Sequence, residues 1–266
     1  MSLDLAGIDA RIEWADEHIA QLESRFPVFQ KRKPYETFVK ANPDPAQNSD
    51  VCLKINEPAA TEFLREVALR TGDVVHSLRA ALDYLTYAAV PVPTAQTAFP
   101  VWRDDKRPIP TAAQYKSAVL RKVKGAPSDF IKLCLAIEPY FGGNHEAIRI
   151  LDYLDIVNKH RLIIEALASI KHVGLDFGAT LPEHWGLPAD RPEMRLNLVP
   201  EERFPLKDGD PLFSAPLETI RKMKPELPIE VVLGEPKAFA GRPVVPALTE
   251  LSEFVKDLID QFRRVL

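Results

Sequence analysis

Apolar positions recur at helical spacing along residues 58–90, a long patterned stretch of the chain. Eight positions of low polarity step by three or four residues: Leu64, Val67, Thr71, Val75, Leu78, Leu82, Leu85 and Ala89. This spacing places them in one stripe, which predicts a helix that faces a core along its whole length. Gly72 interrupts the helix at a cost of about 1 kcal/mol relative to alanine. Close helix packing is the favoured reason, over room for a ligand beside His76.

A second central helix is predicted over residues 144–171, where apolar residues surround most of the helix circumference. A helix that is apolar on most sides is buried. Its middle nevertheless carries five polar residues: Asp155, Asn158, Lys159, His160 and Arg161. Buried charges must be paired or hydrogen-bonded, so these groups need partners from another element.

Further helical patterns cover residues 3–25, 111–124, 128–138 and 246–265. The stripe of 3–25 is narrow and heptad-like, which suits packing on another helix or on a partner chain. The stretch 111–124 carries the only local run of positive charge. A solvated helix face is the favoured explanation for that run, over a phosphate-binding patch.

The remaining segments have the shorter patterns of strands. Residues 34–57 contain two β-prone runs separated by a dense turn cluster, which predicts a hairpin with a long loop. Segments near 172–179, 193–200 and 228–240 are rich in strand formers and divided by prolines. They predict a small antiparallel sheet, which the hairpin is a candidate to join.

Together these patterns predict an α+β protein that is mainly α: an antiparallel helical bundle with a small antiparallel β layer. This length is near the upper size for a single core, so that one domain with an accessory layer and two small domains are both possible. We expect a single domain over residues 1–266. The expected helical core comprises 3–25, 58–90, 111–171 and 246–265, with β accessory segments at 34–57 and 172–241.

Composition narrows the environment and the partners. A net charge of −4 gives no overall attraction to nucleic acid. Cys52 and Cys134 are too few for a disulfide framework, and both are expected to be reduced. No apolar run reaches membrane-spanning length, and the N-terminus lacks the pattern of a signal peptide. These features predict a cytoplasmic protein. The sequence also contains no Gly-rich phosphate loop and no metal-ligand spacing, so we expect no metal and no cofactor.

The best candidate chemistry lies on the two central helices. His76, Arg79 and Asp83 are spaced i, i+3 and i+7 and therefore share one side of their helix. They are the obvious partners for the polar centre of 144–171. A network of this kind between two buried helices commonly satisfies polar groups and fixes packing register, and this is the favoured interpretation.

Four segments occur in an order that resembles a family of uncharacterised bacterial proteins. They are GDVVHSLRAALDYL at 72–85, Phe99-Pro100, EPY at 138–140 and DIVNKHRL at 155–162. The family carries G-D-x-x-H-N-L-R-S-A-L-D-H-L, F-P, Q-P-Y and D-K-H-R-L in the same order. More distantly, the family helix resembles the HEPN superfamily of helical bundles. That resemblance implies a homodimer and, in many members, metal-independent ribonuclease or toxin activity.

The ribonuclease signature of that superfamily is an arginine followed, after four to six residues, by a histidine. Here Tyr84 occupies the place of the histidine after Arg79, and a phenol with a pKa near 10 is a poor general base at neutral pH. Arg70 and His76 offer another pair at a permitted spacing.

Metal-independent RNA cleavage needs a base, an acid and a cation. The candidate catalytic residues are His76, Arg79, Asp83, His160 and Arg161. Either histidine can act as base or acid, and either arginine can hold a phosphate. The candidate ligand-binding residues are Asp155, Asn158 and Lys159. We therefore expect a HEPN-like protein that binds a nucleotide, RNA or a protein partner. A metal-independent ribonuclease in phage defence or stress response is the alternative.

Overall fold

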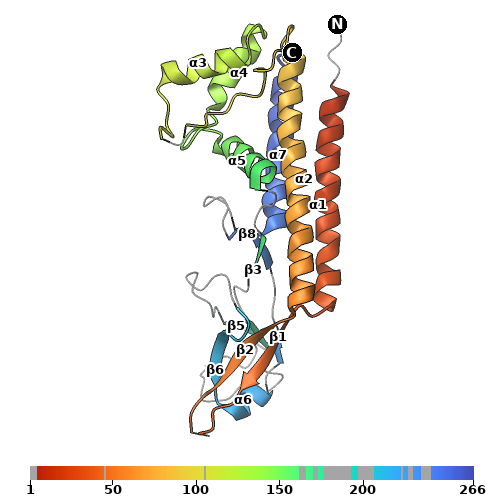
Figure 1. Ribbon diagram of the computed structural model, residues 1–266, viewed down its shortest axis with the longest axis vertical. Helices are drawn as coiled ribbons and strands as arrows, with labels where there is room; N and C mark the ends of the chain where they lie inside the picture. The colour runs from red at the N-terminus through yellow and green to blue at the C-terminus, as the bar shows by residue number, and fades with distance from the viewer. Residues whose placement is uncertain are drawn as a thin grey trace. The chain divides into compact units, whose positions relative to one another are not determined.

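A computed structural model of the chain (Figure 1) has a mainly helical α+β fold, as the sequence patterns predict. The structure describes residues 5–44, 46–104, 106–161, 166–169, 173–176, 193–196, 207–222, 224–226, 230–234 and 241–266. No helix in these ranges is long and apolar enough to cross a membrane.

The described helices lie close to the predicted ranges, except that α5 is shorter than expected and α6 falls within 172–241, where only β segments were expected. They are α1 (Ala6–Lys31), α2 (Glu57–Ala89), α3 (Ala112–Lys122), α4 (Ser128–Ile137), α5 (Glu146–Arg161), α6 (Leu217–Lys222) and α7 (Val244–Arg263). The strands are β1 (Tyr35–Lys40), β2 (Ser49–Ile55), β3 (Ala166–Ser169), β4 (Val173–Asp176), β5 (Glu193–Leu196), β6 (Pro211–Ala215), β7 (Lys224–Glu226) and β8 (Glu230–Leu233).

One prediction about the second central helix is wrong. The helix was expected to reach residue 171, but α5 ends at Arg161 and residues 166–169 form β3, which pairs with β8. A short apolar run is compatible with a buried helix or a buried strand, and periodicity alone does not separate them. Pairing with β8 makes residues 166–169 a strand, because tertiary pairing overrides local propensity.

Helix α1 also extends beyond its predicted end at residue 25 and continues through Pro27 to Lys31. Aromatic packing accounts for the extra turns. The ring of Phe29 stacks on that of Phe63 with centroids 3.7 Å apart, and Phe26 meets the same ring edge-on at 5.2 Å. These contacts favour continued helix despite the proline.

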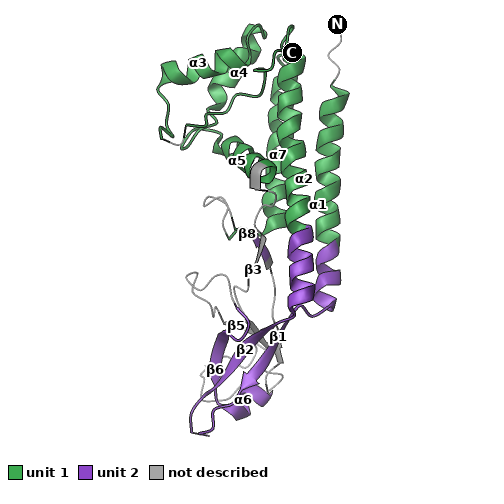
Figure 2. Cartoon of the chain, in the orientation of Figure 1, with its two compact units in different colours: residues 1–24, 67–165, 233–266 green, residues 25–66, 166–232 purple. Residues whose placement is uncertain are grey.

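The chain divides into two compact units, coloured separately in Figure 2. Unit 1 comprises residues 1–24, 67–165 and 233–266, and unit 2 comprises residues 25–66 and 166–232. The boundaries fall inside α1 and inside α2. The residues expected to carry chemistry all belong to unit 1.

Polar contacts between α1 and α7 show how these two helices of unit 1 run. Asp16 of α1 accepts hydrogen bonds from Ser252 and Lys256 of α7, each at 2.6 Å. Asp9, nearer the start of α1, pairs with Arg263 at the end of α7. These contacts run in opposite directions along the two helices, so α1 and α7 are antiparallel. The core between the helices includes the buried ring of Phe262, which meets Phe99 and Phe130 at 5.7 and 4.7 Å.

Helix α3 begins with a capping box. The Thr111 side chain accepts from the backbone N–H of Gln114, and the Gln114 side chain accepts from the backbone N–H of Thr111. Tyr115 then donates its hydroxyl to the carbonyl of Cys134 at 2.8 Å, which joins α3 to α4. This contact fixes the helix whose last turn carries Arg121 and Lys122.

Unit 2 contains the predicted hairpin. β1 pairs antiparallel with β2 from Tyr35–Ile55 to Lys40–Asp50, and β2 pairs antiparallel with β6. The hairpin is therefore completed by β6 at Pro211–Ala215. β4 forms a separate sheet, antiparallel to β5 and β7. The strands expected near 172–179 and 193–200 are thus present, but in a sheet that the hairpin does not join.

Gly72 is buried in α2 because α5 approaches it closely. The Asn158 side chain donates to the Gly72 carbonyl at 3.2 Å, and a Cβ at residue 72 would lie 2.2 Å from the Asn158 side-chain oxygen. Gly7, in α1, is the matched control, because its nearest neighbour would be a Tyr84 ring carbon at 3.4 Å.

We predict that Gly72→Ala lowers the melting temperature, since the overpacking cost of about 1–3 kcal/mol exceeds the helix-propensity gain of about 1 kcal/mol. Gly7→Ala should leave it unchanged or raise it. Adding Asn158→Ala to Gly72→Ala should restore part of the loss. Thermal unfolding by circular dichroism tests this, and a Gly72→Ala protein as stable as wild type contradicts it.

Candidate functional site

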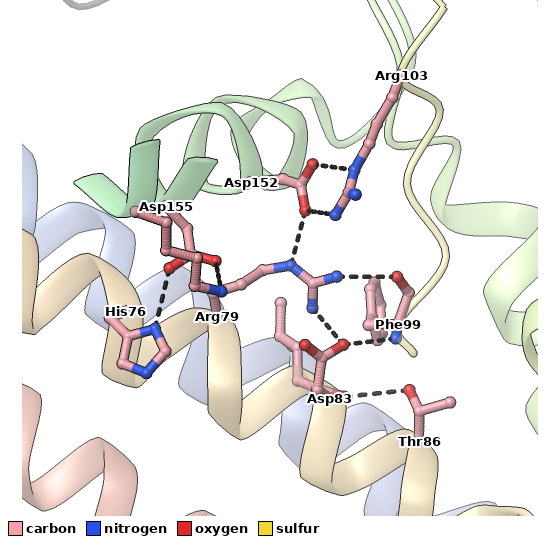
Figure 3. A network of polar contacts seen from close by, with 10 residues as sticks. His76, Arg79, Asp83, Thr86, Phe99, Arg103, Asp152 and Asp155 are labelled. Atoms are coloured by element: carbon pink, nitrogen blue, oxygen red, sulfur yellow. Dashed lines mark hydrogen bonds and ion pairs between the residues drawn. The ribbon is translucent and has the colours of Figure 1, made fainter. Parts of the chain in front are cut away.

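Three polar contacts join α2 to α5 in register. The Asn158 side chain donates to the Gly72 carbonyl. The His76 Nδ1 lies 3.0 Å from Asp155 Oδ1, and Arg79 Nε donates to Asp152 Oδ1 at 2.8 Å (Figure 3). Successive contacts ascend along α2 and descend along α5, so the two helices cross in opposite directions. The structure therefore brings together the two polar groups that the sequence placed on facing helices.

Arg79 is the most deeply buried cation of this network, with 3% of its side chain exposed. All three of its nitrogens are used. Nε donates to Asp152, Nη1 donates to Asp83 at 2.6 Å, and Nη2 donates to the Phe99 carbonyl at 3.2 Å. The guanidinium thus bonds α5, α2 itself and the connection after α2 at the same time.

Asp83 also bonds both Arg79 and the backbone of Phe99. Its Oδ1 accepts from Arg79 and from the backbone N–H of Phe99 at 2.8 Å (Figure 3). Both backbone polar groups of Phe99 are therefore bonded to the α2 pair, while the Phe99 ring is buried against Phe262. The backbone of Phe99 is thus held in place, and the segment from Phe99 to Arg103 continues from this position.

Asp152 and Arg103 belong to the site but were not predicted. Arg103 Nε donates to Asp152 Oδ2, and Nη2 donates to Oδ1, both at 2.6 Å. Burial acts to raise the pKa of Asp152, but the hydrogen bonds and charges of Arg103 and Arg79 outweigh it and hold that pKa below the usual value. Asp152 lies one turn before Asp155 on the same face, a spacing that was available as a signal. Arg103 lies in an irregular connection, where no periodicity marks it.

The His76 pair has a different character. Asp155 is buried and its second oxygen accepts from Lys159 Nζ at 2.6 Å, whereas 46% of the His76 side chain is exposed. A buried carboxylate therefore holds one ring nitrogen of a half-exposed imidazole. Such an arrangement can orient a histidine for proton transfer.

Other predicted residues lie elsewhere or outside the described part. His160 and Arg161 end α5, and their side chains fall outside the described residues. Tyr84, at the position of the family's histidine, accepts from Arg11 of α1 at 3.2 Å rather than joining the network. Within the described ranges, no three His, Cys, Asp or Glu residues are grouped as metal ligands.

A cleft of about 460 Å³ opens beside this network. Its walls come from α2, the connection after Phe99, and α3: Arg79, Phe99, Val101, Trp102, Arg103, Asp104, Ala118, Arg121 and Lys122. Four of these nine side chains are cationic and one is acidic. The indole of Trp102 is held by a hydrogen bond from Nε1 to the Arg107 carbonyl at 2.7 Å.

Arg121 and Lys122 come from the basic run of the sequence. Among the residues that the structure describes, neither side chain has a hydrogen bond or an ion pair. Burial lowers the pKa of the Lys122 ammonium below its usual value, and the nearby charges of Arg103 and Arg121 lower it further. The last turn of α3 therefore adds positive charge to the cleft that the described residues do not neutralise directly.

Comparison of the chain with protein-family models, curated proteins and solved structures finds no match. The HEPN resemblance therefore stays a prediction, and function has to be argued from the geometry of the cleft and the network.

The lowered pKa of Asp152 makes a prediction for stability. Below about pH 4, the unfolded chain binds a proton at Asp152 that the folded chain does not bind, so the free energy of unfolding falls as the pH decreases. We expect Asp152→Asn to be less stable than wild type at pH 7 and to lose part of this pH dependence.

Urea unfolding at pH 7, 5, 4 and 3 measures both effects. Asp129→Asn, at an exposed position on α4, controls for the loss of one carboxylate. An Asp152→Asn protein whose stability falls as steeply with acid as that of wild type would show that the Asp152 pairing does not stabilise the fold.

Proposed function

We propose that the protein binds a phosphate-bearing ligand, a nucleotide or RNA, in the cleft between α2, the connection after Phe99 and α3. The observation that carries this proposal is that Arg121 and Lys122 line the cleft without partners among the described residues. Arg79 and Arg103 are paired with Asp83 and Asp152, but the adjacent charges of Arg121 and Lys122 repel each other. An anionic ligand relieves that repulsion.

The network around Arg79 has a mainly structural part in this proposal. Its guanidinium is already bonded at three nitrogens, and its burial leaves little of it for a ligand. Arg103 differs, because 54% of its side chain is exposed. Its bonds to Asp152 use Nε and Nη2, and Nη1 has no partner in the part of the chain that the structure describes. Arg79 therefore positions Arg103 through the shared carboxylate, and Arg103 contacts the ligand.

The size and lining of the cleft suit a nucleotide. A volume of about 460 Å³ lies within the usual range of small-molecule sites, about 300–1,000 Å³. Trp102 provides an aromatic surface on which a base can stack. Because the whole chain is negative, the attraction comes from this local group of cations and not from the net charge.

The broader assignment goes with this proposal. We propose a HEPN-like, cytoplasmic helical protein that acts as a homodimer. The family-like helix lies in α2, and both cysteines are buried and free. Exposed aromatic side chains on α1 and α2, namely Trp14, Tyr84 and Tyr87, support a partner chain at these helices.

A second candidate is metal-independent RNA cleavage, and the His76–Asp155 pair favours it. In this proposal the ring nitrogen that Asp155 does not hold either takes the proton of the RNA 2′-OH as the 2′-oxygen attacks phosphorus, or gives a proton to the 5′-oxygen as the P–O5′ bond breaks. Arg79 is too buried to hold the phosphate, so the cation would have to come from Lys159 or from the side chains beyond it.

Binding is tested with two double variants of equal charge. Arg121→Ala/Lys122→Ala removes the two cleft cations, and Lys116→Ala/Lys124→Ala removes two exposed lysines of the same run that do not line the cleft. We expect the first to weaken binding of AMP and of a short RNA at least about tenfold. The second should change it less than about threefold.

Isothermal titration calorimetry at low and moderate salt measures these affinities. Equal losses in both double variants would mean that general surface charge, not the cleft, attracts the ligand. Absence of any binding by wild type would remove the proposed function.

Cleavage is tested with purified protein, a labelled RNA and a chelator. If the second candidate holds, wild type cleaves, His76→Ala loses about 100-fold or more in rate, and its melting temperature stays close to that of wild type. Leu69→Ala, an exposed substitution on the same helix, is the control. Intact RNA with wild type, or equal cleavage by His76→Ala, rejects this candidate.

A further inference from the structure

Three cationic groups of the cleft are open to a ligand and come from three separate side chains. They are Nη1 of Arg103, the guanidinium of Arg121 and the ammonium of Lys122. Arg103 is oriented by its two-point contact with Asp152, while Arg121 and Lys122 are adjacent in the last turn of α3. The three cations therefore come from two of the elements that line the cleft, the connection after Phe99 and α3.

The positive charge of the cleft matches one particular phosphate group. A phosphate monoester has three terminal oxygens and about two negative charges near neutral pH, whereas a diester within a strand has two such oxygens and one charge. Arg103 is already paired with Asp152, so Arg121 and Lys122 contribute two positive charges without a carboxylate partner among the described residues. A monoester balances these two charges, whereas a diester balances only one.

Asp104 adds a reason against a strand that passes through the cleft. Its carboxylate lines the same space, and its Oδ1 is occupied by the backbone N–H groups of Lys106 and Arg107 at 3.0 and 3.1 Å. A second phosphate near this carboxylate is repelled. The Oδ2 atom has no partner among the described residues and suits a sugar hydroxyl or a base amino group.

Trp102 extends the site in the direction of the base. It lines the main cleft and also a smaller hollow of about 20 Å³ that shares Arg121 and Lys122 with it. Its backbone N–H donates to the Pro139 carbonyl at 3.3 Å, and its indole N–H donates to the Arg107 carbonyl. Both the backbone and the ring of Trp102 are therefore held in place. A fixed aromatic ring beside a phosphate site loses little entropy when a base stacks on it.

We infer that the cleft recognises a terminal phosphate monoester on a nucleoside, as in a nucleoside monophosphate or at the 5′-phosphorylated end of RNA. The phosphate contacts Arg103, Arg121 and Lys122, and the nucleoside lies toward Asp104 and Trp102. This inference rests on the proposed function and goes beyond it, because it requires discrimination between a monoester and a diester.

The discriminating experiment uses four probes at one salt concentration. They are AMP, adenosine, and one short oligoribonucleotide with either a 5′-phosphate or a 5′-hydroxyl. We expect AMP to bind at least about tenfold more tightly than adenosine, and the 5′-phosphorylated RNA to exceed its 5′-hydroxyl form by a similar factor. Whichever of AMP and phosphorylated RNA binds more tightly identifies the source of the monoester.

Variants connect this discrimination to the cleft. Arg121→Ala/Lys122→Ala should reduce the ratio between phosphorylated and hydroxyl probes toward one, and Lys116→Ala/Lys124→Ala should preserve it. If both RNA forms bind wild type equally and the cleft variant weakens both, phosphate binding in the cleft stands and the monoester inference is overturned. If no probe binds wild type, the proposed function itself fails.

Discussion

The contact between Arg79 and Asp152 is the constraint on which the geometry of the site depends. Both side chains are almost fully buried, and a buried charge persists only when its partners satisfy it. Removing one partner of such a pair typically costs about 3–5 kcal/mol. Arg79 therefore restricts where α5 and the connection after α2 can lie, since both must supply acceptors to the same guanidinium.

The cleft follows from this constraint. Asp83 and Arg79 bind the two backbone polar groups of Phe99, and Asp152 orients Arg103. The wall formed by Val101–Asp104 is thus held from α2 and α5. Helix α3 adds two further positive charges to the lining of the cleft, Arg121 and Lys122. The paired cations hold this arrangement, and Arg121 and Lys122, which have no ion-pair partner among the described residues, are the cations that we propose to contact a ligand together with Arg103.

Much of the helical part of the fold could be predicted, because amphipathic periodicity is strong over long helices. The end of α5 could not, since the run at 166–169 is too short to separate a buried helix from a buried strand. His76, Arg79 and Asp83 were found by their shared face and Asp155 by its burial. Arg103 was missed because its role depends on a carboxylate 49 residues away. The roles of Arg121 and Lys122 depend on what α3 faces.

Hydrogen exchange with and without AMP tests the central claim, that ligands bind in the cleft which the Arg79 network positions. The account predicts slower amide exchange in 101–104 and 118–122 when AMP is present, and unchanged exchange in strand β2 of unit 2. Protection that appears only outside the cleft walls, or no change in them at saturating AMP, would contradict it.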